Sequence, residues 1–398
     1  MLKVDKNHPS TDWIEQIREL YPCEAEIDRV LTSKLVRRGG PAYAPIQLDD
    51  VITGTELLLR NRIGGDIKLL RPRWLSGGAS KLQMAFDLDW VQPDVGRTCT
   101  PMVLRMEPSE SIVETSRLRE FQAIQAMQGV VPIPPAYWID ATAEYLPYPA
   151  IVYGFASGVS KPSNSHSAVT GLGTFIPSAL RQPLGHQFVD HLARIHTYDW
   201  RTADLSAFEA PKAGTHAVEL HLNHWERVWE EDANEDVPLM RLAMAWMRDN
   251  MPAVDHISFI HGDYRVGNFL FTEEDIRISA WLDWEMAYLG DRHEDLAWAA
   301  KSIFGHYDET GSTFLVGGFM PADEFFAAYE KASGLSVNPQ TLKFYEVFNN
   351  YRAVAISLAS GYRAARNGKT HQDVLLAWLS GISYPNLEEL RVQLEELV

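Results

Sequence analysis

The sequence predicts an α+β fold of two lobes, in which a small antiparallel sheet precedes a larger helical lobe. Three observations predict it. The chain has 398 residues, more than one ordinary domain of about 100–200 residues contains. From residue 66 to 155, short apolar segments alternate with turn residues, as they do in β-strands. Beyond residue 156, the apolar residues mostly recur at the spacing of amphipathic helices.

Residues 1–65 are predicted to form an N-terminal helical extension. The apolar residues of 11–38 fall on one helical face, and Pro22 is expected to break this helix in two. Residues 38–45 have the composition of a linker, and a short helix is expected over 49–61. We assign no chemistry to this extension.

Residues 66–155 are predicted to form the N-lobe. Strands are expected over 67–70 and 82–88, joined as a hairpin by a Gly-rich turn, and again over 101–106 and 150–155. One helix is expected over 115–128, because its apolar residues recur at helical spacing.

Residues 156–398 are predicted to form the C-lobe. Residues 160–183 are rich in Ser, Pro and Gly and are expected to form a loop, whereas 257–284 alternate short strands with polar turns. Helices are expected over 186–198, 217–231, 239–250, 293–304, 322–332, 341–366 and 371–380.

Composition and charge exclude several classes of protein. With 46% hydrophobic and 22% charged residues, the chain is not largely disordered. Its net charge of −17 predicts neither a nucleic-acid nor a membrane partner. Two cysteines, no signal-peptide pattern and no long apolar run favour a cytoplasmic location. The charge is uneven: residues 1–155 hold 17 basic and 20 acidic residues, and residues 156–398 hold 19 and 33.

The densest polar motif reads HGDYRVGN over residues 261–268, and LDWE follows over 282–285. Phosphoryl transfer needs a carboxylate beside the acceptor hydroxyl and oxygen ligands for Mg²⁺. Asp263, Asn268 and Asp283 occur in that order, and short apolar strands lead into both motifs. One such Asp or Asn is most often only a turn residue. The two motifs together, in this order, favour a site for phosphoryl transfer over a set of turn residues.

The two motifs, with the GDRHEDLAW stretch that follows, resemble the aminoglycoside phosphotransferase and choline kinase-like family, which is related to protein kinases. The resemblance runs from about residue 66 to 370 and implies a two-lobed protein-kinase-like fold. It implies that Asp263 is the catalytic base and that Asn268 and Asp283 hold Mg²⁺. It further implies that His261 and Asp295 support the loop, and it leaves Glu285 as a less specific candidate for supporting the metal site.

The resemblance places the nucleotide in the N-lobe, where free backbone N–H groups of a Gly-rich turn meet phosphates. A Walker A sequence is absent. Arg105 lies where protein kinases carry a Lys, and relatives associated with acyl-CoA dehydrogenases also read Val-Leu-Arg there. Arg keeps the charge but not the geometry of Lys, and Lys81 is a competing cation. The implied nucleotide residues are Ser76, Gly77, Gly78, Ser80, Arg105, Glu120, Tyr153 and Phe155.

The predicted activity is the phosphorylation of a small-molecule hydroxyl by ATP or GTP with Mg²⁺. An antibiotic and a metabolite, such as a hydroxy acid or its CoA thioester, both remain open as acceptors, because the variable helices choose the acceptor. Two alternatives are a catalytically weak nucleotide-binding module and a metal-dependent hydrolase that uses His261, Asp263 and His293. The sequence makes no prediction of oligomeric state.

Overall fold

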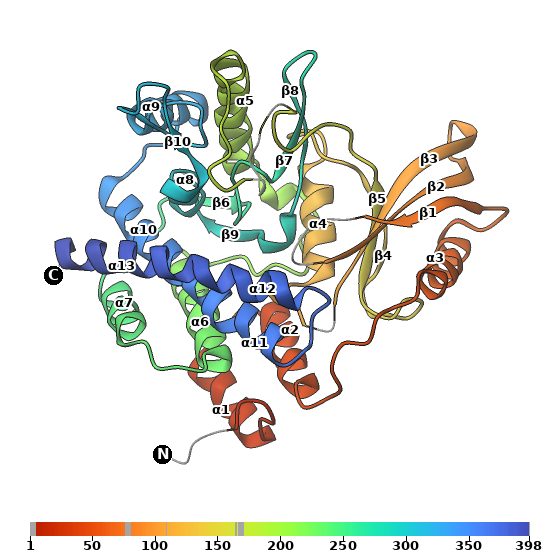
Figure 1. Ribbon diagram of the computed structural model, residues 1–398, viewed down its shortest axis with the longest axis horizontal. Coiled ribbons are helices and arrows are strands. Elements are labelled where there is room, and N and C mark those ends of the chain that lie inside the picture. Colours follow the sequence, from red (N-terminus) through yellow and green to blue (C-terminus); the bar gives the residue numbers. More distant parts are fainter. Residues whose placement is uncertain (1–4, 76–80, 109, 164, 166–170, 398) are drawn as a thin grey trace.

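The structure is a computed structural model, and it describes residues 5–75, 81–108, 110–163, 165 and 171–397. A five-stranded antiparallel sheet in the order β1-β2-β3-β5-β4 stands at the right of Figure 1, with the helical part at the left. The strands are β1 (Lys68–Trp74), β2 (Leu82–Gln92), β3 (Gly96–Met106), β4 (Ala136–Asp140) and β5 (Ala150–Gly154). The predicted antiparallel sheet is confirmed.

Helices cover both faces of this sheet. Alternate residues of β2 are buried on one face, where α3 (Leu48–Ile63) packs with Val51, Leu58 and Leu59. Burying each such side chain stabilises the fold by about 1.5–3 kcal/mol. On the other face, α4 (Arg117–Met127) contacts β4 and β5, because neighbouring residues of a strand point to opposite faces.

The part after residue 156 is mainly helical, as predicted. Two short antiparallel pairs lie within it: β6 (Ile257–Ile260) with β9 (Tyr288–Asp291), and β7 (Phe269–Thr272) with β8 (Arg277–Trp281). A third pair joins β10 (His306–Tyr307) to β11 (Phe314–Leu315). The α-helices are α5 (Ser178–Thr197), α6 (His216–Asp232), α7 (Pro238–Asp249), α8 (His293–Ala299), α9 (Ala322–Ser333), α10 (Pro339–Val354), α11 (Tyr362–Arg366), α12 (Asp373–Leu379) and α13 (Ser383–Leu397).

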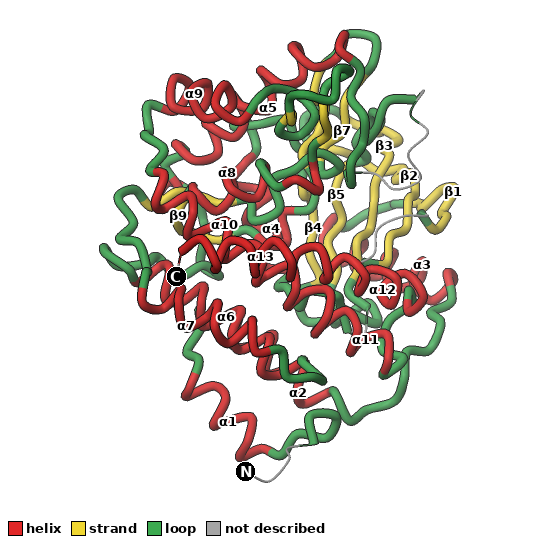
Figure 2. Tube along the Cα trace, turned by 60° about the vertical axis from the view of Figure 1, so that its left-hand side comes forward, coloured by secondary structure: helices red, strands yellow, loops and turns green. Residues whose placement is uncertain are grey.

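The N-terminal helices are divided between the two parts of the molecule. The break at Pro22 is confirmed, because α1 (Thr11–Leu20) and α2 (Ala25–Arg37) are separate helices. Figure 2 shows α2 beside α6 of the helical part, whereas α3 packs on the sheet. The proposed division of the chain at residues 65 and 155 stays a prediction.

Several elements differ from the prediction. Strand β4 and helix α13 were not predicted, and α5 begins at Ser178, inside the expected loop. Helix α5 runs through Pro183, which removes one backbone N–H donor without ending the helix. The helix expected over 293–304 ends at Ala299, and the one expected over 341–366 contains a π-helical segment, η4 (Ala355–Gly361).

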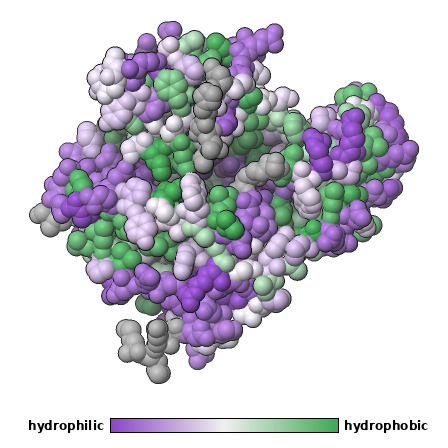
Figure 3. All heavy atoms as spheres, viewed as in Figure 1, coloured by the Kyte–Doolittle hydropathy of each residue, from purple (hydrophilic) through white to green (hydrophobic). Residues whose placement is uncertain are grey.

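Hydrophilic residues are unevenly distributed over the surface. On the face shown in Figure 3, hydrophilic residues gather at the lower end, where α1 and α2 lie. Among the described residues, no helix combines the length and the apolar composition needed to cross a membrane.

Candidate active site

The HGDYRVGN motif forms the loop between the short strands β6 and β7. Phe259 and Ile260 of β6 are fully buried, which fixes the start of the loop. Gly262 follows with a positive φ of 81°, and a Cβ there would lie 2.4 Å from the Met286 carbonyl oxygen. Only glycine fits this position without strain. The next residue, Asp263, therefore enters the site from a tightly packed turn.

The Asp263 carboxylate is held by three side chains. Its Oδ1 accepts hydrogen bonds from Arg265 Nε at 2.9 Å and Trp298 Nε1 at 2.6 Å. Its Oδ2 accepts one from Asn268 Nδ2 at 2.5 Å. The side chain keeps 18% of its surface exposed. Asp263 is thus fixed in orientation and still open to solvent on one side.

Asp295 and His261 support this loop from below. The buried Asp295 carboxylate accepts the backbone N–H groups of His261 at 2.8 Å and Gly262 at 2.9 Å. His261 Nδ1 accepts the Asp263 N–H at 3.2 Å, so Nε2 carries the proton and donates to the Leu282 carbonyl at 3.1 Å. Burial lowers the pKa of His261, which favours this neutral ring.

Asn268 and Asp283 bring oxygen atoms to the same loop pair. The Leu282 N–H donates to the Asn268 carbonyl at 2.8 Å, which joins the end of the loop to the residue before Asp283. Asn268 donates its amide nitrogen to Asp263, and its amide oxygen accepts no hydrogen bond from the described part of the chain. Asp283 has a left-handed φ of 59° and a side chain that is 41% exposed. Asn268 thus offers an amide oxygen, and Asp283 offers the oxygens of a carboxylate.

Arg105 connects the sheet to the Asp283 segment. Its guanidinium lies 2.9 Å from Glu120 Oε1, 2.7 Å from Asp283 Oδ1 and 3.1 Å from Glu285 Oε2. Burial disfavours the charged guanidinium, but these three carboxylates outweigh it and hold the pKa of Arg105 well above its ordinary value. Arg105 is therefore a permanent cation between α4 and Asp283.

A second cation group surrounds Glu285. Lys81 Nζ lies 3.3 Å from Glu285 and 2.8 Å from Glu107, and Arg117 lies 3.0 Å from Glu285 and 2.6 Å from Glu107. Burial acts against the Glu285 carboxylate, yet Lys81, Arg105 and Arg117 keep its pKa below its ordinary value. Glu285 is therefore neutralised by three cations.

Sequence reasoning missed Glu107 and Arg117, since nothing in their local sequence marks them. They join this cluster only through pairs that reach across the fold: Arg117 and its partner Glu285 are 168 residues apart.

The remaining predicted nucleotide residues divide into two groups. Tyr153 lies on β5 opposite Val103 of β3, and burial raises its pKa. Phe155 is 41% exposed, and its N–H donates to the Pro101 carbonyl at 2.9 Å. The predicted Gly-rich turn residues lie outside the described residues: Ser76, Gly77, Gly78 and Ser80.

The histidines of the hydrolase alternative are engaged elsewhere. His293 Nδ1 lies 2.6 Å from Asp291, and its Nε2 accepts the Asn338 N–H at 2.9 Å. Both nitrogens of His261 are bonded, Nδ1 to the Asp263 N–H and Nε2 to the Leu282 carbonyl. In the described ranges, no three His, Cys, Asp or Glu side chains are grouped as a metal site. The geometry does not support that alternative.

The antiparallel sheet, the helical part and the loop pair together define a protein of the kinase-like class. The chain belongs to the phosphotransferase enzyme family, whose model matches residues 89–345. Both the predicted family and the predicted fold are confirmed.

Curated relatives match this chain over part of their length. Acyl-CoA dehydrogenase family member 11 of Gallus gallus is 28% identical over 42% of this chain and 22% of that protein. Acyl-CoA dehydrogenase family member 10 of Mus musculus is 25% identical over 70% of this chain and 27% of that protein. The chain thus spans well under half the length of either relative.

Solved structures show the same fold. A Ralstonia eutropha protein assigned as an aminoglycoside phosphotransferase superposes with a TM-score of 0.62 at 20% identity, covering 86% of this chain and 98% of that one. A macrolide 2′-phosphotransferase of type I superposes with a TM-score of 0.53 at 17% identity, covering 85% and 98%. At this identity the likeness speaks for the fold alone.

Proposed function

We propose that this phosphotransferase moves the terminal phosphoryl group of ATP or GTP to a hydroxyl of a small molecule in the cytoplasm. The observation that carries the proposal is the geometry of Asp263. Its carboxylate is fixed by three donors, remains partly exposed, and is bonded directly to Asn268. A fixed carboxylate on a braced loop is what orientation of an acceptor hydroxyl requires.

In this proposal Asp263 accepts the hydroxyl proton as the oxygen attacks the terminal phosphorus, and the bond from that phosphorus to the bridging oxygen breaks to release ADP or GDP. Trp298 and Arg265 occupy one carboxylate oxygen and Asn268 occupies the other, so the carboxylate cannot rotate away. The loop beneath it is braced by Asp295 and neutral His261. These residues support Asp263 and take no proton themselves.

The donor set near Asp263 fits Mg²⁺. The amide oxygen of Asn268, which accepts no hydrogen bond from the described residues, and the exposed carboxylate of Asp283 are hard oxygen ligands, which Mg²⁺ prefers. When bound there, Mg²⁺ would neutralise charge on the nucleotide phosphates. Glu285 is not proposed as a ligand, because three cations already occupy it.

The nucleotide is proposed to lie between the sheet and the loop pair. Arg105 would pair with phosphate oxygens, while its contact with Glu120 keeps the guanidinium oriented. The Phe155 carbonyl and the Ala156 N–H, which take part in no hydrogen bond among the described residues, would meet the adenine. Residues 76–80, which lie outside the described residues, are proposed to bind the phosphates.

The acceptor is proposed to be a small molecule bound by the helical part. The predicted choice between an antibiotic and a metabolite stays open. One solved structure with this fold is a phosphotransferase in complex with gentamicin, which describes that protein and not this chain. The curated relatives carry acyl-CoA dehydrogenase names, which makes hydroxylated acyl metabolites worth including in a screen.

A mass-shift screen of hydroxyl compounds with ATP and Mg²⁺ tests the proposal. Wild type should add one phosphoryl group to at least one compound. Asp263→Ala should lose about 10³-fold or more of that activity, because the proton acceptor is gone. Asp275→Ala is the matched control, an exposed carboxylate on the β7–β8 turn, and should keep wild-type activity.

One observation favours the nucleotide-binding alternative. Arg105 lies 2.7 Å from Asp283, so a candidate metal ligand is already paired with a cation. If wild type binds Mg-ATP but phosphorylates no hydroxyl in a broad panel, this alternative replaces the enzyme proposal. Activity that persists in Asp263→Ala would likewise contradict the enzyme proposal.

A further inference from the structure

Helix α2 of the N-terminal segment touches both α4 and α6. Figure 2 shows α2 beside α6, and hydrogen bonds join the start of α2 to the start of α4. Helix α4 carries Glu120, the partner of Arg105. An element outside the matched family region is therefore in contact with the helix that orients the proposed phosphate-binding cation.

The contact between α2 and α4 is polar and largely buried. Glu24 Oε2 accepts Arg119 NH1 at 2.8 Å, and its Oε1 accepts Arg119 NH2 at 3.2 Å. Glu26 Oε1 accepts the Ser116 hydroxyl at 2.5 Å. Arg119 and Ser116 are 3% and 1% exposed. Two carboxylates of α2 thus hold the first turn of α4 at two points.

Arg119 also reaches the segment that follows Asp283. Its NH2 donates to the Ala287 carbonyl at 3.1 Å, and its guanidinium lies 4.4 Å from the centre of the Phe208 ring. The next residue along α4 is Glu120. A shift of α4 that breaks the Arg119 contacts would therefore also move Glu120 relative to Arg105.

The other end of α2 is anchored on α6. Lys34 Nζ lies 2.9 Å from Glu231 and 3.0 Å from Asp232, and all three side chains are buried. Because this end is fixed, α2 can transmit the position of α6 to α4.

We propose that Glu24 and Glu26 are positioning residues for the nucleotide site. They act through α4: Glu24 holds Arg119, Glu26 holds Ser116, and the fixed helix keeps Glu120 within reach of Arg105. This inference rests on the proposed function, since it assigns Arg105 to the nucleotide phosphates. The N-terminal helices thereby help to form the site, because α2 holds α4 in the position where Glu120 pairs with Arg105.

The test uses the full chain with Mg-ATP as the probe. Glu24→Ala should weaken Mg-ATP binding in calorimetry by about 10-fold, because α4 then spends less time in the position where Glu120 orients Arg105. Hydrogen exchange of residues 117–127 should become faster in the same variant. Glu24→Gln keeps one acceptor for Arg119 and should fall between wild type and Glu24→Ala in both measurements.

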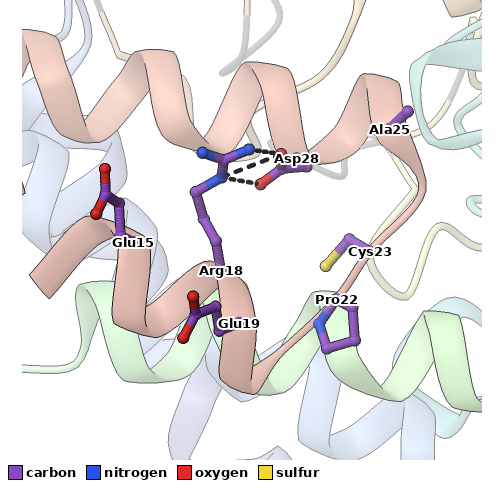
Figure 4. Close-up of a pocket in the computed structure, with 7 residues that line it drawn as sticks. All are labelled: Glu15, Arg18, Glu19, Pro22, Cys23, Ala25 and Asp28. Carbon is purple, nitrogen blue, oxygen red and sulfur yellow. Dashed lines mark hydrogen bonds and ion pairs between the residues drawn. The ribbon is translucent and has the colours of Figure 1, made fainter. Parts of the chain in front are cut away.

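Arg18→Ala is the matched control. It removes a salt bridge of the same segment, to Asp28, that does not touch α4 (Figure 4). This control should keep wild-type Mg-ATP affinity and wild-type exchange in α4, even if its melting temperature falls.

The outcomes distinguish a failure of the positioning role from a failure of the proposed function. Unchanged affinity in both Glu24 variants, or an equal loss in Arg18→Ala, would overturn the positioning role. Should Glu24→Ala fail to fold, Glu24→Gln alone decides. A wild-type protein that binds no Mg-ATP would instead contradict the proposed function.

Discussion

The Asp263 carboxylate is distinguished from the many other acidic residues by the donors around it. Trp298 and Arg265 share one oxygen, Asn268 takes the other, and the Trp298 ring in turn stacks 4.3 Å from the Arg352 guanidinium. A charge alone would not orient a hydroxyl. At the scale of single residues, the proposed chemistry depends on these hydrogen bonds.

Trp298→Phe tests this dependence. An aromatic ring of smaller size remains, but the indole N–H to Asp263 is lost, so kcat should fall about 10-fold, as for a hydrogen bond to a charged group. The KM for ATP should stay near wild type. Steady-state kinetics with the acceptor found in the screen measures both. Trp246→Phe on α7 is the control, and an unchanged kcat in Trp298→Phe would contradict the role given to the indole.

Glu114 makes the stability depend on pH. Burial and the neighbouring Glu107 carboxylate raise the pKa of Glu114 to about 7, whereas an unfolded Glu titrates near about 4.3. The folded state therefore binds this proton more tightly. The stabilisation is complete below about pH 4 and is lost as the pH rises through about 7, by up to about 3–4 kcal/mol.

Glu114→Gln removes this titration. Relative to wild type, the variant should gain more stability at about pH 8 than at about pH 4, and urea unfolding at the two pH values measures the difference. Glu274→Gln, an exposed control, should show no such change. A Glu114→Gln effect that is equal at both pH values would refute the assignment.

The site residues differ in how visible they are from the sequence. Asp263 and Asn268 share one short turn, and Asp283 follows on the next strand pair, so their spacing alone predicts that they meet. Arg105 and Glu120 were found through the family resemblance. Glu107 and Arg117 were not found, because a buried ion pair between distant segments has no local pattern.

At the scale of elements, the turn that carries Asp263 in the β6–β7 loop depends on Gly262. The Gly262 backbone has a positive φ and lies against the Met286 carbonyl, and Arg352 donates to the Gly262 carbonyl at 2.8 Å. Asp295 holds the same turn from the other side. Every contact there fixes the backbone that delivers Asp263.

Gly262→Ala should therefore damage both stability and activity. The strained φ costs about 1–3 kcal/mol, and the new Cβ must displace the segment that follows Asp283. Urea unfolding and transfer kinetics measure the two effects. Gly334→Ala is the control for the cost of the positive φ alone, because φ is 71° there and a Cβ meets nothing within 4 Å. Equal activity in the two variants would contradict the close-packing argument.

Element prediction succeeded where periodicity is strong and failed where local signals conflict. The helices of 217–231 and 239–250 were predicted within one residue of α6 and α7. Pro183 and the Ser/Gly-rich stretch before it indicated a loop, yet packing of Leu184 and Phe188 in the core extends α5 back to Ser178. Strand β4 is short and is defined by its pairing with β5. No local sequence pattern predicts that pairing.

At the scale of the whole molecule, the excess negative charge lies in the helical part. Some of it is neutralised by the N-terminal segment, where Lys34 and Arg38 pair with Asp232. Burial acts against the Asp232 carboxylate, yet these cations keep its pKa well below its ordinary value. The N-terminal helices are thus joined to the rest of the chain by buried charge as well as by apolar packing.

Lys34→Met should lower the free energy of unfolding by about 3–5 kcal/mol, because two buried carboxylates lose a cation. Urea unfolding measures this loss. Lys343→Met breaks a more exposed pair with Glu396 and should change stability by about 1 kcal/mol or less. Equal losses in the two variants would show that the α2–α6 contact is not a buried ion pair in solution.

Asp263 is proposed to accept a hydroxyl proton during phosphoryl transfer, and ³¹P NMR of the reaction can follow that transfer in wild type and variant. Wild type with ATP, Mg²⁺ and the acceptor found in the screen should give a new phosphomonoester resonance. Asp263→Asn, which keeps the shape of the side chain but not its basicity, should give none on the same timescale. A phosphomonoester formed equally by both proteins would contradict the role of Asp263 as the proton acceptor.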